Sequence, residues 1–122
     1  MNALLAQIMR LCLSFPETSE RLSHGAPSFF IQEKKAFVHA HDNHHGDGKL
    51  AIWCAAPAGA AAVLVESEPE IYYIPAYVGH LGWVGVRLDR NAAWDDIAGA
   101  IQNAYLTRAP KKLKDVLVNK DR

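Results

Sequence analysis

Residues 28–55 read SFFIQEKKAFVHAHDNHHGDGKLAIWCA, and the pattern of this stretch decides the fold class. Aromatic and β-branched side chains gather in residues 28–32 and 36–41 around a charged turn, which predicts a β-hairpin. The polar segment 42–49 holds two glycines and several turn-forming residues, and the alternating run behind it predicts a third strand over residues 50–55. We therefore expect consecutive antiparallel strands rather than alternating βαβ units.

Helical spacing of apolar residues appears on both sides of this stretch. It predicts an amphipathic helix over residues 4–15, stopped near Pro16, and a well-defined helix from residue 94 with Arg108 in its last turn, ended by Pro110. Good helix formers predict a short helix over residues 58–67. Residues 111–122 are expected either to add a short amphipathic helix or to form a basic tail.

The remaining segments complete the expected sheet. Residues 70–75 and 83–89 alternate like strands, whereas residues 21–27 have the composition of a loop. The whole pattern predicts an α+β fold with an antiparallel sheet of about five strands, and with the N-terminal and C-terminal helices packed on one face. The opposite sheet face is then expected to be open and to offer a surface for a partner.

Composition and charge narrow the class of protein. The 122 residues suit a single domain over residues 1–122, and 13 basic side chains balance 13 acidic ones. Because a dedicated nucleic-acid-binding domain usually has a basic surplus, any DNA-binding surface on this chain must be local.

The sequence shows neither an export signal nor an apolar run of roughly 18 residues, so we expect a cytoplasmic protein without a membrane partner. Cys12 and Cys54 lie in apolar patterns, which suits buried, reduced thiols.

Four stretches that together cover nearly the whole chain resemble the YjbR/MmcQ family. They are LSFPETSERLSHGAPSFFI (13–31), NHHGDGKLAIWCAAPAG (43–59), EPEIYYIPAYVGHLGWVGVRLDRNAAWDDIAGAI (68–101) and AYLTRAPKKL (104–113). The resemblance implies a frataxin-like (CyaY-like) fold, with terminal helices on one side of an antiparallel sheet. It also implies DNA binding through a double-wing arrangement of hairpins. The likeness to frataxins is one of fold only, so it implies neither iron binding nor a frataxin partner.

Aromatic and basic side chains supply the candidates for DNA binding. Trp83 and Arg87 are expected on the same face of one strand, where an indole can stack on a base while a guanidinium pairs with phosphate. Trp53 is a further aromatic residue that can point toward the open face. Basic residues at expected hairpin tips and near the C-terminus could add phosphate contacts: Lys34, Lys35, Lys49, Arg108, Lys111, Lys112 and Lys114. The alternative interpretation is that these are ordinary solvated charges and that Trp83 anchors the sheet edge.

The segment HAHDNHHGD (39–47) packs four histidines and two aspartates into nine positions. Neutral imidazoles and carboxylates can bind zinc or a similar divalent ion, so the segment offers an alternative function as a metal site. The candidate ligands are His39, His41, His44 and His45, the first two of which would share a strand face. The competing interpretation is that the segment shapes a hairpin loop and that its histidines are solvated or hydrogen-bonded within it.

A second cluster surrounds a glycine-containing loop, and consists of Tyr72, Tyr73, Tyr77, His80 and Trp83. It predicts either one wall of a small-molecule pocket or aromatic packing in the core. The sequence contains no nucleophile elbow, phosphate loop or dinucleotide fingerprint, so we expect no enzymatic activity and no cofactor. The leading hypothesis is a small cytoplasmic domain that binds DNA through hairpin tips and an open sheet face. The alternatives are a small-molecule- or metal-binding accessory protein and a protein-interaction module.

Overall fold

The computed structural model describes residues 3–120 of the chain. Within this range the chain forms four α-helices, six β-strands and two 3₁₀ helices. In chain order they are α1 (Ala3–Ser14), β1 (Thr18–Ser23), β2 (Ala26–Ile31), β3 (Lys35–Asp42), η1 (His44–Gly46), β4 (Leu50–Cys54), α2 (Ala60–Ser67), β5 (Tyr72–Tyr73), η2 (Gly79–Leu81), β6 (Val84–Arg87), α3 (Trp94–Arg108) and α4 (Lys111–Lys120).

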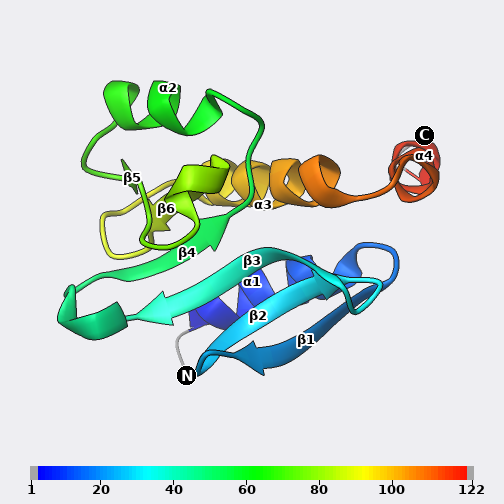
Figure 1. The fold of residues 1–122 in the computed structure, drawn as a ribbon, viewed down its shortest axis with the longest axis horizontal. Helices are drawn as coiled ribbons and strands as arrows, with labels where there is room; N and C mark the ends of the chain where they lie inside the picture. Colours follow the sequence, from blue (N-terminus) through cyan, green and yellow to red (C-terminus); the bar gives the residue numbers. More distant parts are fainter. Residues whose placement is uncertain (1–2, 121–122) are drawn as a thin grey trace.

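Within residues 3–120, the six strands form one antiparallel sheet in the order β1-β2-β3-β4-β6-β5 (Figure 1). The predicted antiparallel α+β class is confirmed, but the sheet has one strand more than the expected five or so. The additional strand is β1, which includes part of the expected loop 21–27. Its sequence TSERLS is polar because β1 is an edge strand without a buried position, and a polar edge strand resembles a loop in composition.

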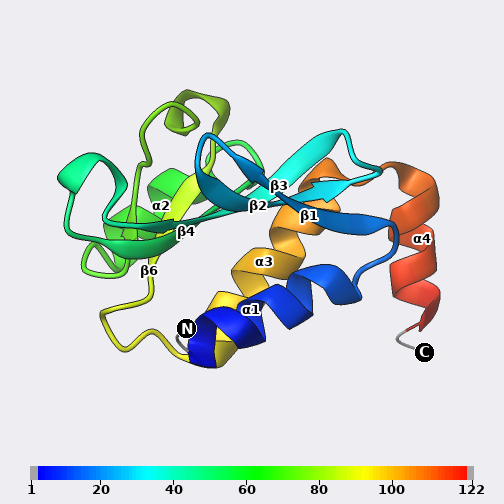
Figure 2. The same cartoon turned by 90° about the horizontal axis from the view of Figure 1, so that it is seen from below.

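Two helices cover one face of the sheet. Figure 2 shows α1 and α3 together beneath the strands, and α3 contacts β3 and β4 near the middle of the sheet. α2 contacts the short edge strand β5. The prediction that helices from the N-terminal and C-terminal parts of the chain lie on one side of the sheet is therefore confirmed. No helix within residues 3–120 has the length and apolar character to cross a membrane.

The main core lies between these helices and the sheet. Ile8 and Cys12 of α1, four residues apart on one helical face, are fully buried, as is Ile101 of α3. Tyr105 is also fully buried, and its hydroxyl donates a hydrogen bond to the Pro16 carbonyl at 2.9 Å. Burial of each large apolar side chain is worth about 1.5–3 kcal/mol, so this layer supplies much of the stability of the fold.

The opposite face of the sheet is not fully open. Figure 2 shows the loop that contains η2 above the strands, on the side away from α1 and α3. Trp53 and Trp83 belong to this face, yet each is only 4% exposed. The expectation that these indoles form an exposed surface is wrong, because loop residues and histidine rings cover them.

Candidate functional site

Strand alternation and register bring histidine and tryptophan side chains together on the face away from α1 and α3. His39 and His41 lie two residues apart on β3 and therefore share this face. His39 pairs with Trp53 of β4, and Trp53 pairs with Gly85 of β6. The His39 ring also stacks on Trp83, with ring centroids 5.1 Å apart and an interplanar angle of 21°. The cluster therefore crosses β3, β4 and the start of β6.

The turn between β3 and β4 adds two further imidazoles. Asn43 precedes η1 in the left-handed region, with φ 59°, and His45 within η1 has φ 48°. Asparagine adopts this region more readily than most residues other than glycine. The Asn43 side chain also accepts a hydrogen bond from the Gly48 N–H at 2.7 Å. This bond closes the turn, which carries His44 back to the ring of Trp53.

The imidazole rings pack against one another and against Trp53. The ring centroid of His41 lies 3.8 Å from that of Trp53 and 4.7 Å from that of His44. His44 lies 4.8 Å from Trp53 and 4.1 Å from His45. Tyr77, from the loop between β5 and β6, approaches His44 edge-on at 5.9 Å. Aromatic pairs of this kind are worth about 0.5–1.5 kcal/mol beyond their burial, so ring packing largely fixes these histidines.

A groove of about 750 Å³ opens over this cluster, and we name it the imidazole groove. Five histidines line it: His24, His39, His41, His44 and His45. The rest of the lining comes from Trp53, Tyr77, Val78 and Ser23. Of the six histidines in the chain, only His80 lies outside this lining.

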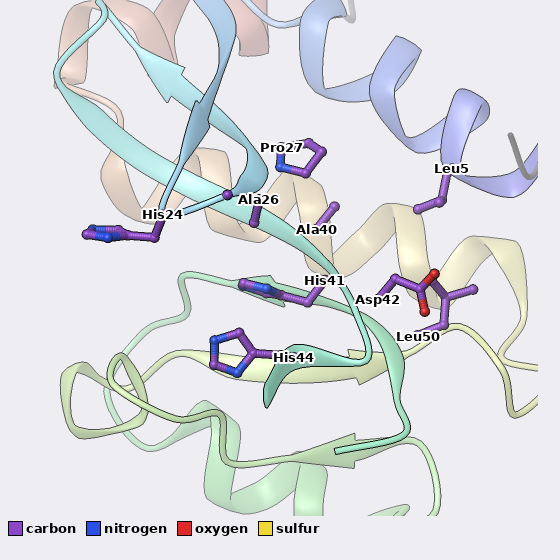
Figure 3. A pocket seen from close by; sticks show the side chains of 10 residues that line it. Leu5, His24, Ala26, Pro27, Ala40, His41, Asp42, His44 and Leu50 are labelled. Carbon is purple, nitrogen blue, oxygen red and sulfur yellow. The ribbon is translucent and has the colours of Figure 1, made fainter. Parts of the chain in front are cut away.

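A smaller cavity of about 320 Å³ adjoins the imidazole groove and shares His24, His41 and His44 with it. Figure 3 shows these three rings on one side of β3, and Asp42 on the other. The cavity lies where β2 and β3 separate, because their ladder ends at the pair of Ser28 and His39 although both strands continue. The next residue on β2 is Pro27, which has no N–H to give to the ladder.

Burial keeps the deeper imidazoles of the groove neutral. It lowers the pKa of His39, and the nearby His24 adds to the effect. The pKa of His41 is lowered to about 4. Burial is the largest cause, and the neighbouring His44 is the second largest. Both rings are therefore uncharged at neutral pH, and each offers one donor and one acceptor nitrogen.

The tautomer of His39 follows from its hydrogen bonds. The Ser28 hydroxyl donates to the Ala26 carbonyl at 3.1 Å, and the same oxygen lies 2.7 Å from His39 Nδ1. A hydroxyl has only one hydrogen, so Nδ1–H of His39 donates to Ser28. This leaves Nε2 as an acceptor on the edge of the ring opposite Ser28.

The predicted metal ligands His39, His41, His44 and His45 come together in the groove, but no three of them are placed to hold a metal ion. Among residues 3–117, for which side chains are described, no group of three or more histidine, cysteine, aspartate or glutamate side chains could hold a metal ion. The rings instead meet one another and the indoles as packed aromatic groups. The structure therefore gives no geometric support to a zinc site in this segment.

The predicted nucleic-acid pair is not available for binding in the expected way. Trp83 is stacked on His39 and is only 4% exposed. Arg87 donates two hydrogen bonds to the Asp89 carboxylate, both at 3.0 Å. Gly85 lies between Trp83 and Arg87 on this face, and the ring of Tyr73 covers it. A Cβ on Gly85 would lie only 2.5 Å from that ring. An indole without a free face and a neutralised guanidinium do not form a base-stacking platform.

The other basic candidates divide between two ends of the sheet. Lys34 and Lys35 lie at the β2–β3 turn, and the Arg108 side chain donates a hydrogen bond to the neighbouring Ala36 carbonyl at 3.1 Å. This bond places the start of α4 at the same end, as Figure 1 also shows. Lys49 precedes β4 at the opposite end, where its Nζ lies 5.2 Å from the centre of the Tyr73 ring.

Lys111, Lys112 and Lys114 belong to α4 and therefore to the end that carries the β2–β3 turn. Lys111 forms an exposed ion pair with Asp115 at 2.8 Å, which is a weak interaction. The β2–β3 turn and the lysines of α4 thus give one basic end, whereas Lys49 and Arg87 are separate from it.

His24 is the groove residue that sequence reasoning missed. It lies in the expected loop 21–27, in a two-residue turn with Gly25 between β1 and β2. Both residues have positive φ, 52° for His24 and 81° for Gly25, as two-residue hairpin turns with a terminal glycine require. The His-Gly pair between two short strands was the signal that could have revealed this hairpin and its histidine.

The fold and the site together define a small α+β domain with helices on one sheet face and a ligand-sized groove on the other. The chain belongs to the YjbR family, whose family model matches residues 13–107. A similar solved structure is the crystal structure of Deinococcus radiodurans protein DR2400, which contains a domain described as DUF419. The two share 15% sequence identity with a TM-score of 0.74, over 93% of this chain and 86% of the other. That likeness shows the fold alone, and no curated protein matches the chain.

Proposed function

We propose that this protein binds a small molecule with a planar ring in the imidazole groove. The observation that carries the proposal is the groove itself: its volume of about 750 Å³ lies within the range of about 300–1,000 Å³ that is usual for ligand sites. Its walls are aromatic, and a few polar atoms converge on it, which is the usual composition of such a site.

Tyr77 is the residue best placed to stack on a bound ring. Its side chain is 70% exposed at the edge of the groove, and its backbone has φ 63°. Left-handed backbone is uncommon for a bulky residue and marks a position held by its surroundings. His44 and His45 pack against Tyr77 at steep interplanar angles, with ring centroids 5.9 and 6.2 Å from that of Tyr77. A planar ligand on the exposed part of the Tyr77 ring would exchange solvent for an aromatic surface and lie beside these two imidazoles.

The polar atoms of the groove suit a ligand with hydrogen-bonding groups on its ring. His39 presents an acceptor, and the neutral ring of His41 provides one donor and one acceptor. Ser23 and Tyr77 add hydroxyl groups at the rim. A heteroaromatic compound can therefore satisfy the lining better than a purely hydrocarbon ring can.

The proposal can be tested with neutral probes and two variants of the 74–82 loop. Adenosine and 2-naphthamide are titrated into the full chain, and binding is followed through the amide and indole signals in NMR spectra. We expect saturable shifts of Trp53 and the groove histidines, and about tenfold weaker binding in Tyr77→Ala, since one stacking surface is lost. Leu81→Ala is the matched control, because Leu81 is 61% exposed on the same loop but does not line the groove. Absence of saturable shifts with every ring-containing probe would refute the proposal.

A second function, binding of duplex DNA, is favoured by one specific feature, the basic end formed by Lys34, Lys35, Lys111 and Lys112. Exposed lysines from two elements at one end of the sheet could contact phosphates along a duplex. This surface is separate from the imidazole groove. Acidic residues also lie there, among them Glu33 and Asp115, so the local positive charge is moderate.

Fluorescence anisotropy of labelled duplex DNA at low and moderate salt tests this second function. We expect the double change Lys34→Gln and Lys35→Gln to weaken binding and to reduce the salt slope by up to about two. Lys49→Gln, at the opposite end, is the matched control. Arg87→Ala should also have little effect, because Asp89 already occupies the guanidinium. A slope unchanged by the loss of Lys34 and Lys35 would remove this end from consideration.

A further inference from the structure

The ionisable groups that line the imidazole groove share one property. Besides the phenol of Tyr77, they are all imidazoles. An imidazole is either neutral or positive, and a phenol stays neutral at physiological pH. Among the side chains that the structure describes, no carboxylate, lysine or arginine lines this groove. The charge of the lining can therefore range from zero to positive, but cannot become negative.

Charged groups outside the lining do not reverse this bias. Asp42 lines only the smaller cavity, on the other side of β3 from His41, as Figure 3 shows. Asp47 follows η1, and its influence on the pKa of His41 is smaller than that of burial, His44 and His39. Asp89 is paired with Arg87, and Lys49 lies over Tyr73.

The hydrogen-bond donors of the lining also favour a negatively charged ligand group over a positively charged one. The N–H of His39 is donated to Ser28, but every other imidazole of the lining has an N–H, and the hydroxyls of Ser23 and Tyr77 can also donate. Hydrogen bonds from such donors to an ionised oxygen are roughly twice as strong as bonds between neutral groups. An ammonium group, in contrast, would meet no carboxylate in the groove.

From this lining we infer that the ligand carries an anionic oxygen group, a carboxylate or a phosphate, on its planar ring. The inference rests on the proposed function, since it names the chemical class of ligand for the same groove. The ring lies against Tyr77, and the anionic group accepts hydrogen bonds from the imidazole N–H groups of His44 and His45. These two histidines are selected because they line the groove directly beside Tyr77, with ring centroids 5.9 and 6.2 Å from its ring.

The test uses pairs of probes that share a ring system, of which only one member carries an anionic group. Calorimetry at pH 7 compares 2-naphthoate with 2-naphthamide, and adenosine monophosphate with adenosine, on the full chain. We expect at least one anionic probe to bind about tenfold more tightly than its neutral partner, because its hydrogen bonds are charge-assisted. The carboxylate pair and the phosphate pair distinguish the two possible anionic groups.

Two variants locate the effect. In His45→Phe the ratio of anionic to neutral affinity should fall to about twofold, since one imidazole N–H donor is replaced by a ring without a donor. The double change His44→Phe and His45→Phe should abolish the preference for the anionic probe. His80→Phe is the matched control, because His80 is the one histidine of the chain outside the groove lining. Circular dichroism establishes that each variant is folded.

The outcomes separate the inference from the proposed function. Equal affinity for both members of each pair would overturn the inference and leave the small-molecule function in place. An anionic preference that persists in the double variant would also overturn it, because the imidazoles would not be its source. If no probe of either charge binds, the proposed function fails as well.

Discussion

The two faces of the sheet bury aromatic rings in different ways. On the helix face, Phe15 stacks on Tyr105 of α3, with ring centroids 4.8 Å apart, and Phe37 meets Tyr105 edge-on at 5.6 Å. All three rings are buried. On the groove face, the rings are mainly histidine and tryptophan, and short loops cover them. Helices provide a continuous apolar cover, whereas loops leave space between the rings. The first face is therefore suited to stability and the second to binding.

The largest effect should come from the helix face. Ile101→Ala removes a fully buried side chain of α3, and the helix cannot collapse into the space without disturbing the sheet. We expect a loss of about 3–4 kcal/mol in the free energy of unfolding, measured by urea denaturation. Val63→Ala, at a side chain that is 66% exposed on α2, should change it by less than about 0.5 kcal/mol. Similar values for the two variants would mean that α3 does not carry the core.

The next effect tests how tightly the groove face is packed. Gly85→Ala places a Cβ about 2.5 Å from the ring of Tyr73, so the ring must move. We expect a loss of about 1–3 kcal/mol in urea denaturation, as for other overpacked sites. Gly99→Ala is the matched control: a Cβ at Gly99 meets nothing within 4 Å, and alanine there should stabilise α3 by about 0.5–1 kcal/mol. If Gly85→Ala is as well tolerated as Gly99→Ala, the groove face is loosely packed.

This contrast also explains which parts of the molecule could be predicted from sequence. Helix-face residues such as Ile8, Ile97 and Ile101 follow the helical period because one unbroken surface covers them. The composition of the edge strand β1 predicts a loop over part of its length, since its polar residues reflect its exposed position. The sequence therefore does not predict that His24 belongs to the groove, because a residue in an expected loop cannot be assigned to a face of the sheet.

The candidate site was predictable only in part, for a related reason. Strand alternation correctly placed His39 and His41 on one face and brought Trp83 to the same face as Arg87. Which segments cover a sheet face depends on the course of the loops. Loop sequences lack the regular spacing of apolar residues that reveals helices and strands. The loop 74–82 and η1 bury Trp83 and Trp53, so the sequence showed where these side chains belong but not that they are covered.

Acid should distinguish the faces, because only the groove face contains buried imidazoles. The folded pKa of His41, about 4, lies below the ordinary value of 6.5, so the unfolded chain takes up a proton first as the pH falls. Stability from this ring is complete above pH 6.5 and is lost between pH 6.5 and 4. The pKa shift limits the contribution of His41 to the free energy of unfolding to about 3 kcal/mol. Because the ring is partly exposed, we expect about 1–2 kcal/mol. His39 shifts in the same direction.

Urea denaturation at pH 7 and pH 4.5 measures this dependence. Carboxylates also titrate near the lower pH, so the informative quantity is the difference between the unchanged protein and His41→Gln. We expect His41→Gln to be less sensitive to acid by about 1 kcal/mol, and His80→Gln to behave like the unchanged protein. Equal acid sensitivity in all three proteins would show that His41 titrates alike in the folded and unfolded chains.

The smallest effects compare one tyrosine hydroxyl on each face. Tyr105→Phe removes a hydrogen bond to the Pro16 carbonyl, and Tyr73→Phe removes the acceptor of the Trp53 indole N–H at 2.8 Å. Each should cost about 1 kcal/mol in urea denaturation, since one buried partner is left unsatisfied. The two changes should differ in a second measurement, because only Tyr73→Phe alters the surroundings of Trp53 and so the indole N–H signal in NMR spectra. If Tyr105→Phe shifts that signal equally, the two faces are coupled through the sheet, and the separation of stability from binding does not hold.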